Sequence, residues 1–356
     1  MKVHWTKYNF KFKFDAGTSR GILRNKISYF VFIEDNSGET GIGECSLLPG
    51  LSIDDRPDYE EKLTRVCNSY QEQRISDYDA LLKFFEEHLA ENWPSIRMGI
   101  ETAFLDRMNG GGRIVYHNGF INGEAIPING LIWMGEKRFM LEQVKEKIES
   151  GFRCIKVKIG AIDFDAELEV LKYVRSKFTE QDITLRVDAN GAFNMQNVME
   201  KMTLLERLKI HSIEQPIKAG QWDSMRKLCE RSPIPIGLDE ELIGAYAYSQ
   251  KKELIEFIKP HFIILKPSLL GGFNASDDWI QLARSNEAGW WITSALESNI
   301  GLNAICQYTF GLGVEMEQGL GTGALYRNNI ESPLMVKNGN IQYVKGQSWD
   351  LSGLQI

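Results

Sequence analysis

Five short apolar runs in this chain each carry a charged residue at or near their end: IKVKIG (155–160), ITLRVDAN (183–190), HSIEQP (211–216), IPIGLDE (234–240) and FIILKPS (262–268). The charged residues are Lys158, Asp188, Glu214, Asp239 and Lys266, at successive intervals of 30, 26, 25 and 27 residues. Each interval has room for one strand and one helix. In a parallel β/α barrel the ends of successive strands meet at one rim, where barrel enzymes hold their active sites. The spacing therefore predicts a barrel with three carboxylates and two ammonium groups at its mouth.

The same alternation of strand and helix extends beyond these five runs. We predict eight barrel strands, near residues 126–133, 153–159, 183–188, 211–214, 234–239, 261–266, 289–294 and 312–317. Helical segments such as KRFMLEQVKEKIESG (137–151) lie between them. Strands that alternate with helices of roughly 10–15 residues are typical of βαβ units and a parallel sheet.

The segments on either side of the barrel predict a second domain. Residues 1 to about 50 alternate like an antiparallel meander with a turn at Asn36-Ser37-Gly38, and residues from about 57 to 109 have a helical pattern. Residues 327–356 contain a turn between short strands that can return to the N-terminal domain. We therefore expect an α/β fold with a TIM-type parallel β/α barrel at 123–326. An α+β capping domain would be formed by 1–122 and completed by 327–356.

The composition narrows the class of protein. The chain has 356 residues and a formal net charge of −7, which argues against a nucleic-acid partner and against attraction to anionic membranes. No uncharged apolar stretch approaches the ~18 residues of a membrane span, and the N-terminal segment lacks the apolar core of a secretory signal. The five scattered cysteines include no CxxC pair. We expect a reduced, cytoplasmic protein, and a homo-oligomer is compatible with the sequence.

Alternation within the strands predicts which way the charges point. In IKVKIG, Ile155 and Val157 share one face while Lys156 and Lys158 share the other. If the aliphatic faces meet the outer helices, the charged side chains point into the barrel. Charged side chains are rarely buried unless they are paired, so several in register at a barrel mouth indicate a functional site.

The charged residues predict a metal site with a base beside it. Asp188, Glu214 and Asp239 offer only oxygen ligands, and no His or Cys stands at metal-binding spacing around them. Oxygen ligands favour Mg²⁺, with Mn²⁺ as the alternative, whereas zinc prefers nitrogen or sulfur. A lysine near a divalent cation has a lowered pKa and can act as a base near neutral pH. The set suits removal of a proton from the carbon next to a substrate carboxylate.

This constellation, with Lys-x-Lys on the second strand, resembles the muconate-cycloisomerase-like subgroup of the enolase superfamily, whose sites combine a Lys or His base with Mg²⁺. Five further segments resemble the o-succinylbenzoate synthases of that superfamily: GECSLLPGLS (43–52), SIRMGIETAFLD (95–106), LRVDANGAF (185–193), SALESNIGLNA (294–304) and GLGTGALY (319–326). The resemblance covers nearly the whole chain.

The resemblance implies a hydro-lyase reaction on a small-molecule carboxylate. Water would be removed from 2-succinyl-6-hydroxy-2,4-cyclohexadiene-1-carboxylate to make o-succinylbenzoate for menaquinone synthesis, through α-proton abstraction and an Mg²⁺-stabilised enediolate. Lys158 matches the base that takes the proton and then assists departure of hydroxide, and Lys266 matches the cation on the other face. Asp188, Glu214 and Asp239 match the metal ligands. Lys156, Arg186, Asn190 and Ser294 match substrate-contacting positions, although an inward Arg186 also suits a simple pair with a ligand carboxylate.

The family also implies a lid. Two loops of the capping domain, here residues 16–24 and 44–52, would close over the barrel mouth. The residues expected to form it are Arg20, Gly21, Pro49, Gly50 and Leu51, with glycines for backbone freedom and leucines to exclude water. Pro49-Gly50 is equally compatible with an ordinary turn.

Two alternatives share the same scaffold. Dipeptide epimerases and N-succinylamino-acid racemases use the same lysines and metal ligands, and dipeptide epimerases carry Asp-x-Asp on the eighth strand. This chain has Glu315-Met316-Glu317 there, a partial likeness that a polar strand end would also explain. A non-catalytic binding barrel is the alternative of another class, and the intact set of lysines and carboxylates argues against it.

Overall fold

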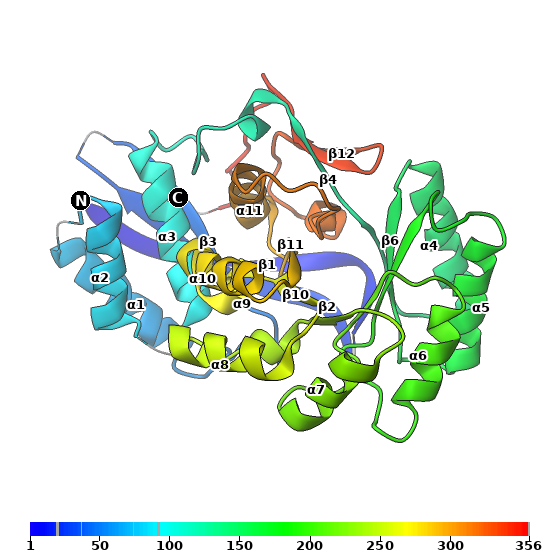
Figure 1. Cartoon of the computed structure of the whole chain (residues 1–356). Helices are drawn as coiled ribbons and strands as arrows, with labels where there is room; N and C mark the ends of the chain where they lie inside the picture. The colour runs from blue at the N-terminus through cyan, green and yellow to red at the C-terminus, as the bar shows by residue number, and fades with distance from the viewer. Residues whose placement is uncertain (19–20, 37, 74, 91–92, 355–356) are drawn as a thin grey trace.

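The computed structural model describes residues 1–18, 21–36, 38–73, 75–90 and 93–354. It begins with an N-terminal cap, shown on the left of Figure 1. Strands β1 (Lys2–Thr18), β2 (Gly21–Glu34) and β3 (Thr40–Ser46) form an antiparallel sheet in that order. Helices α1 (Tyr59–Glu72), α2 (Tyr78–His88) and α3 (Pro94–Met108) follow. The meander and the helical region are as predicted, while Ser37 of the predicted turn lies outside the described residues.

Glycines let the sheet of the cap lie directly on α3. A Cβ atom on Gly43 would stand 1.8 Å from the carbonyl oxygen of Gly99, and one on Gly99 would stand 2.2 Å from Cys45 Sγ. Any larger residue at either position would push β3 away from the helix. The close contact buries α3 on almost all sides, since its other side meets α9 and α10 of the second domain.

The second domain is the predicted parallel barrel. Its sheet has the strand order β11-β10-β9-β8-β7-β6-β5, and every neighbouring pair is parallel. The strands are β5 (Gly130–Ile132), β6 (Cys154–Lys158), β7 (Thr184–Asp188), β8 (Ser212–Glu214), β9 (Ile236–Leu238), β10 (Phe262–Leu265) and β11 (Gly289–Ile292). The intervening helices are α4 (Lys137–Glu149), α5 (Phe164–Arg175), α6 (Val198–Glu206), α7 (Trp222–Arg231), α8 (Tyr248–Ile258), α9 (Pro267–Leu270), α10 (Gly272–Ser285) and α11 (Asn299–Gly311). Figure 1 shows α4, α5 and α6 on the side of the molecule away from the cap.

The strand predicted at 312–317 was wrong. Helix α11 continues to Gly311, and the described chain between 312 and 317 forms turns and irregular structure. The eighth position of the ring is filled by the next two residues instead. Gln318 bridges Ile128, and Gly319 bridges Thr293, so backbone hydrogen bonds join both edges of the sheet. Residues 312–317 instead connect the end of α11 to Gln318, where the chain joins the ring.

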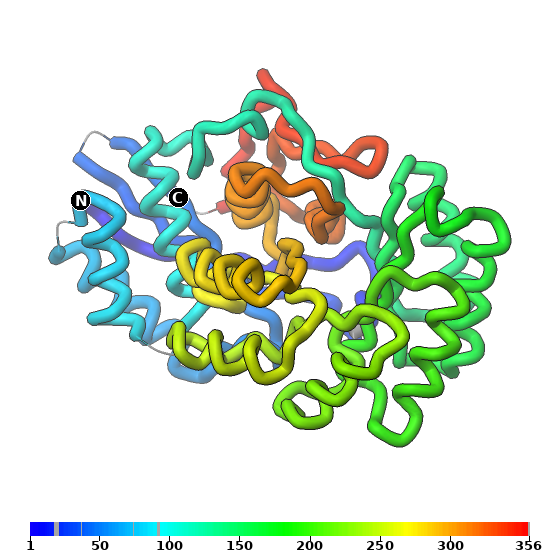
Figure 2. The backbone as a smooth tube through the Cα atoms, in the orientation of Figure 1, coloured from blue at the N-terminus to red at the C-terminus, as the bar shows by residue number. Residues whose placement is uncertain are grey.

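The strand predicted at 126–133 is divided between two sheets. Strand β4 (Ala125–Pro127) pairs with β13 (Asn340–Tyr343), which forms a hairpin with β12 (Leu334–Lys337), while β5 enters the barrel. Figure 2 shows this hairpin, in red, beside the teal segment that enters the barrel. The tail also contacts the cap, where Asn328 Oδ1 accepts the backbone N–H of Lys11 at 2.8 Å. The domain boundaries stated above remain a prediction.

The cores follow the predicted alternation of side chains. Ile155 and Val157 are fully buried among the residues between sheet and helices, while Lys156 and Lys158 point into the ring. All five cysteines are buried and free, as expected for a reduced chain. In the described part of the chain, no helix has both the length and the apolar character that crossing a membrane requires.

Candidate active site

The five charged residues of the sequence pattern do meet at one rim. Lys158 ends β6 and lies in register with Asp188 at the end of β7, which lies in register with Glu214 at the end of β8. Asp239 directly follows β9 and Lys266 directly follows β10. Strand pairing therefore delivers all five to the carboxyl end of the barrel, as the intervals predict.

The side chains at this rim form several ion pairs with one another. Lys156 Nζ lies 2.7 and 2.6 Å from the two carboxylate oxygens of Glu214 and 3.0 Å from Asp188 Oδ2. Lys158 Nζ lies 3.1 Å from the same Asp188 oxygen and donates to Asn190 Oδ1 at 2.8 Å. Lys266 pairs with Asp239. We call these residues, with Glu240, the mouth cluster.

Burial and neighbouring charges shift the pKa values in this cluster in opposite directions. Burial would raise the pKa of Asp188, but Lys156 and Lys158 hold it well below its usual range. Burial together with Asp188 raises the pKa of Glu214 to about 8. The pKa of Lys266 is raised, because the pull of Asp239 and Glu214 outweighs burial. The lowered lysine pKa expected beside a divalent cation remains a prediction for the metal-loaded site.

The carboxylates fit a hard divalent cation in kind. Asp188, Glu214 and Asp239 are buried, offer only oxygen, and lie close enough that the other two both raise the pKa of Glu214. Among the residues the structure describes, no three carboxylate, imidazole or thiolate groups form a ready cluster for one ion. Lys156 stands between Asp188 and Glu214 instead. A cation that binds all three must take over contacts that Lys156 makes in this arrangement.

A cavity that is partly open to solvent is lined by residues of the mouth cluster. Its polar side includes Lys156, Lys158, Asp188, Asn190, Glu240 and Lys266. Its apolar side is formed by Leu23, Leu48, Leu51, Leu131, Trp133 and Leu296. The cavity therefore combines ammonium groups with several apolar wall residues, a composition suited to an anionic substrate with an apolar body.

The predicted substrate contacts divide into two groups. Lys156, Asn190 and Ser294 line the cavity. Arg186 lies outside the cavity walls that the described residues form. Its guanidinium stacks 4.3 Å from the centre of the Trp291 ring and donates to the Glu317 carbonyl at 2.7 Å. The structure thus brings Arg186 neither to the cavity nor to a carboxylate of the mouth cluster, because it sits two residues deeper in the barrel than Asp188.

Residues of the second predicted loop, 44–52, line the cavity, while its role as a lid remains a prediction. Pro49 and Leu51 are part of its wall, while Gly50 is exposed with a φ of 70°, a backbone conformation that favours glycine. From the first loop, Gly21 has a φ of 123° and Leu23 reaches the cavity. Arg20 lies outside the described residues.

Several cavity residues were missed by the sequence reasoning. Glu240 is one, although it stands next to Asp239; burial raises its pKa, and its Oε1 accepts the Asn190 amide at 3.0 Å. Leu131 and Trp133 are others, and the period-two alternation of the first barrel strand places both inward. Thr293 and Thr322 carry no signal of their own in the sequence, since they reach the cavity only through the closure of the ring.

The chain is similar in sequence and fold to known proteins. The family model "Enolase C-terminal domain-like" matches residues 140–347. The o-succinylbenzoate synthase of Desulfotalea psychrophila (strain LSv54 / DSM 12343) is 43% identical over 363 aligned positions, covering 95% of this chain and 98% of that protein. The crystal structure of MenC from Desulfotalea psychrophila LSv54 has a TM-score of 0.86 at 39% identity, covering 96% of this chain and 99% of that one.

A more distant solved structure shares the fold. The dipeptide epimerase from Enterococcus faecalis V583, complexed with Mg and the dipeptide L-Leu-L-Tyr, has a TM-score of 0.82 at 19% identity. The match covers 98% of this chain and 97% of the epimerase chain.

A capped parallel barrel whose mouth combines a carboxylate triad with lysines on the flanking strands defines a class of metal-assisted proton-abstracting enzymes. The extent of the family match and of the sequence identity then specifies the member. The chain belongs to the enolase superfamily and, within it, to the family of the o-succinylbenzoate synthases.

Proposed function

We propose that this enzyme removes water from 2-succinyl-6-hydroxy-2,4-cyclohexadiene-1-carboxylate and releases o-succinylbenzoate, as part of menaquinone synthesis. The observation that carries the proposal is the joint presence of Lys158 and Lys266 at one cavity, on either side of three buried carboxylates. The near full-length similarity to an o-succinylbenzoate synthase supports this choice of substrate.

The metal ligands proposed are Asp188, Glu214 and Asp239, with Mg²⁺ as the favoured ion and Mn²⁺ as the alternative. When bound, the ion supplies Lewis-acid stabilisation of the dianion that forms as the α-proton leaves. Oxygen-only donors at consecutive strand ends support this assignment.

Lys158 is the proposed base, and Lys266 the proposed electrostatic partner. Lys158 Nζ would take the proton from the carbon next to the substrate carboxylate and return it to the departing hydroxide. Its contacts with Asp188 and Asn190 hold the ammonium end in the cavity wall. Lys266 would remain a cation and stabilise the negative charge of the enediolate, held in place by Asp239.

The remaining cavity residues suit the dehydration substrate. Lys156, Asn190 and Ser294 are proposed to contact its polar groups, while Leu48, Leu51 and Trp133 surround the ring and exclude water. A cytoplasmic location remains our expectation, supported by the five free cysteines. A homo-oligomer remains compatible with the sequence and with the proposed function.

Dipeptide epimerisation is the main alternative. The locations of Glu315 and Glu317, the acidic pair near the eighth strand position, argue against it. A dipeptide ammonium needs a carboxylate partner in the cavity. Glu315 is exposed, and Glu317 stands 4.0 Å from Arg186 outside the cavity walls. Weak epimerase or racemase activity is expected at most.

The experiment follows aromatisation by ultraviolet absorbance, beside assays of racemisation on N-succinylamino acids and of L-Ala-L-Glu epimerisation. We expect a higher kcat/KM for aromatisation than for either other reaction. A higher kcat/KM for L-Ala-L-Glu, or a ligand-bound structure with Glu315 or Glu317 on a substrate ammonium, would overturn the proposal.

A further inference from the structure

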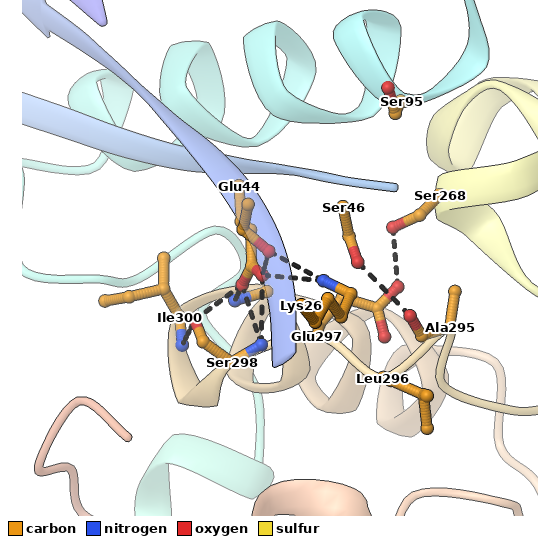
Figure 3. A network of polar contacts seen from close by, with 12 residues as sticks. Lys26, Glu44, Ser46, Ser95, Ser268, Ala295, Leu296, Glu297, Ser298 and Ile300 are labelled. Atoms are coloured by element: carbon orange, nitrogen blue, oxygen red, sulfur yellow. Dashed lines mark hydrogen bonds and ion pairs between the residues drawn. The ribbon is translucent and has the colours of Figure 1, made fainter. Parts of the chain in front are cut away.

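A second cluster of charged side chains lies where the cap meets the barrel (Figure 3). We call it the interface network and define it by its members: Lys26 and Ser28 of β2, Glu44 of β3, Ser268 of α9, and Ser294, Glu297 and Ser298 after β11. All seven are buried, and Lys26, Glu44 and Glu297 are at most 1% exposed. The network is thus sealed from solvent except where Ser294 reaches the cavity.

The hydrogen-bond and ion-pair partners of Glu44 join the cap to the start of α11. Glu44 accepts the backbone N–H of Ser298 at 2.9 Å and that of Gly301 at 3.1 Å, at the N-terminus of α11. A carboxylate there satisfies free N–H groups and complements the helix dipole. Ser28 donates to Glu44 at 2.7 Å, and Lys26 Nζ lies 3.8 Å away. These contacts attach the cap to the barrel without reaching the cavity.

Glu297 has a different set of partners. Ser268 Oγ donates to its Oε1 at 2.5 Å, and Ser294 Oγ donates to its Oε2 at 2.6 Å. The backbone N–H of Glu297 points back to Ser294 Oγ at 3.3 Å. One carboxylate therefore holds two serines that follow neighbouring barrel strands, β10 and β11. Ser268 stands two residues after Lys266, and Ser294 is part of the cavity wall.

Burying this carboxylate is costly. The network contains two carboxylates but one ammonium group, and burial raises the pKa of Glu297 while it lowers that of Lys26. An apolar residue of similar volume would avoid the desolvation penalty at this site. The buried Glu297 carboxylate carries this desolvation penalty and contacts Ser294 of the cavity wall. Both properties point to a function of Glu297 in holding the side chains of the cavity wall in position.

The loop that carries Glu297 also touches the lid. Ser46 of β3 donates to the Ala295 carbonyl at 3.2 Å, and Leu48 packs with Ala295 and Leu269 in a small apolar cluster. Leu296, between Ala295 and Glu297, lines the cavity. Displacement of Glu297 would therefore be felt by the cavity wall and by the lid loop together.

We propose that Glu297 is a positioning residue for the reaction proposed above: it fixes the direction of the Ser294 hydroxyl in the cavity wall and ties it to the segment that carries Lys266. Glu297 does not touch substrate and acts through Ser294. Lys26 of the cap supplies the nearby positive charge. The kinetic test of this inference rests on the proposed function, because it measures aromatisation. The structural test depends only on the rotamer of Ser294.

The first test is a set of substitutions read by steady-state aromatisation. Glu297→Ala removes both serine contacts, so we expect KM to rise roughly 10-fold or more, the size of one lost hydrogen bond to a charged group. kcat should change by less than about 3-fold, because a binding contact and not the base is lost. Glu297→Gln keeps the shape and can still bond both serines, and should restore KM to within about 3-fold of the parent.

A double mutant isolates the route through Ser294. Ser294→Ala should raise KM as Glu297→Ala does, and the two together should be no worse than either alone within about 2-fold. Additive effects would overturn the proposal, because Glu297 would then act elsewhere. The matched control is Glu44→Gln, in the same network but with no cavity partner. It should lower the melting temperature while KM stays within about 2-fold of the parent.

Crystal structures of Glu297→Ala and Glu44→Gln provide a readout that does not depend on turnover. The proposal expects Ser294 to change rotamer only in Glu297→Ala. An unmoved Ser294 together with unchanged KM, and only a lower melting temperature, would reduce Glu297 to a structural residue and overturn the inference. A parent enzyme that fails to aromatise the substrate would refute the proposed function instead, while the Ser294 rotamer would still decide the positioning role.

Discussion

The mouth cluster and the interface network are built from the same components, buried lysines paired with carboxylates, but they meet different surroundings. Lys156 contacts Asp188 and Glu214 at the floor of a cavity, while Lys26 and Glu44 are enclosed between two domains. A buried pair with no access to substrate can only hold structure. A buried pair beside a cavity can exchange partners, with a metal ion or with a substrate anion.

The comparison shows that buried carboxylates serve different purposes in the mouth cluster and in the interface network. In the mouth cluster, carboxylates crowd together and their pKa values separate, with Glu214 raised to about 8 and Asp188 lowered. Such divergence of neighbouring groups is typical of sites that move protons or bind ions. In the interface network most carboxylate oxygens accept hydrogen bonds from serine hydroxyls and helix N–H groups. These carboxylates are enclosed between the two domains.

The sharpest way to test this contrast is to remove a proposed metal ligand. Asp239→Asn should abolish measurable aromatisation and weaken Mg²⁺ binding in calorimetric titration, because one of three oxygen ligands is lost. The fold should stay intact by circular dichroism. Asp223→Asn, on an exposed position of α7, is the control and should behave like the parent. A fully active metal-free preparation would remove the basis for the metal site.

The next largest effect is expected at the base. Lys158→Ala should lower kcat by at least ~10⁴-fold, at the top of the usual range for general-base loss, because no other group is placed to start the reaction. Single-turnover absorbance measurements would check this value. The exposed Lys252→Ala serves as the matched substitution. If Lys158→Ala kept a tenth of the parent activity, the base would have to be reassigned.

Lys26 of the interface network should affect stability instead of activity. Lys26→Met leaves two buried carboxylates without their cation, so unfolding should become easier by ~3–5 kcal/mol in urea titrations. Lys7→Met breaks the exposed pair of Lys7 with Glu60 and should change stability by less than ~1 kcal/mol. Equal effects of the two substitutions would contradict the assigned difference between sealed and exposed pairs.

The smallest effect is expected at the proposed lid loop. Leu51→Ala removes apolar contact area from the cavity wall and should lower kcat/KM by roughly 3–10-fold, at ~0.8 kcal/mol per buried CH₂ group. Steady-state kinetics measure this directly. Val336→Ala, at an exposed position of the C-terminal hairpin, should leave kcat/KM unchanged. An unchanged kcat/KM for Leu51→Ala would show that the loop does not close on the substrate.

Much of the mouth cluster was predictable from the chain because strand ends recur at regular intervals. Regular spacing and alternation placed Lys158, Asp188 and Glu214 on one rim, and the structure has them in register. The prediction failed at the eighth strand. Residues 312–317 form turns and irregular structure, while Gln318 and Gly319 pair with the sheet edges, because their pairing depends on closure of the ring and not on a local pattern. Arg186 alternates correctly inward, yet alternation gives no depth, and depth separates it from the cavity.

Local sequence thus determined the parallel barrel, the cap and the identity of the charged residues at the mouth, since hydrophobic period and chain spacing are local properties. Only the tertiary structure decided which charges face a cavity and which are sealed. The closure of the ring through Gln318 and Gly319, and the meeting of Lys26 with Glu44 and Glu297, join residues far apart in the chain. Such contacts depend on how whole domains pack, a property that no single stretch of sequence carries.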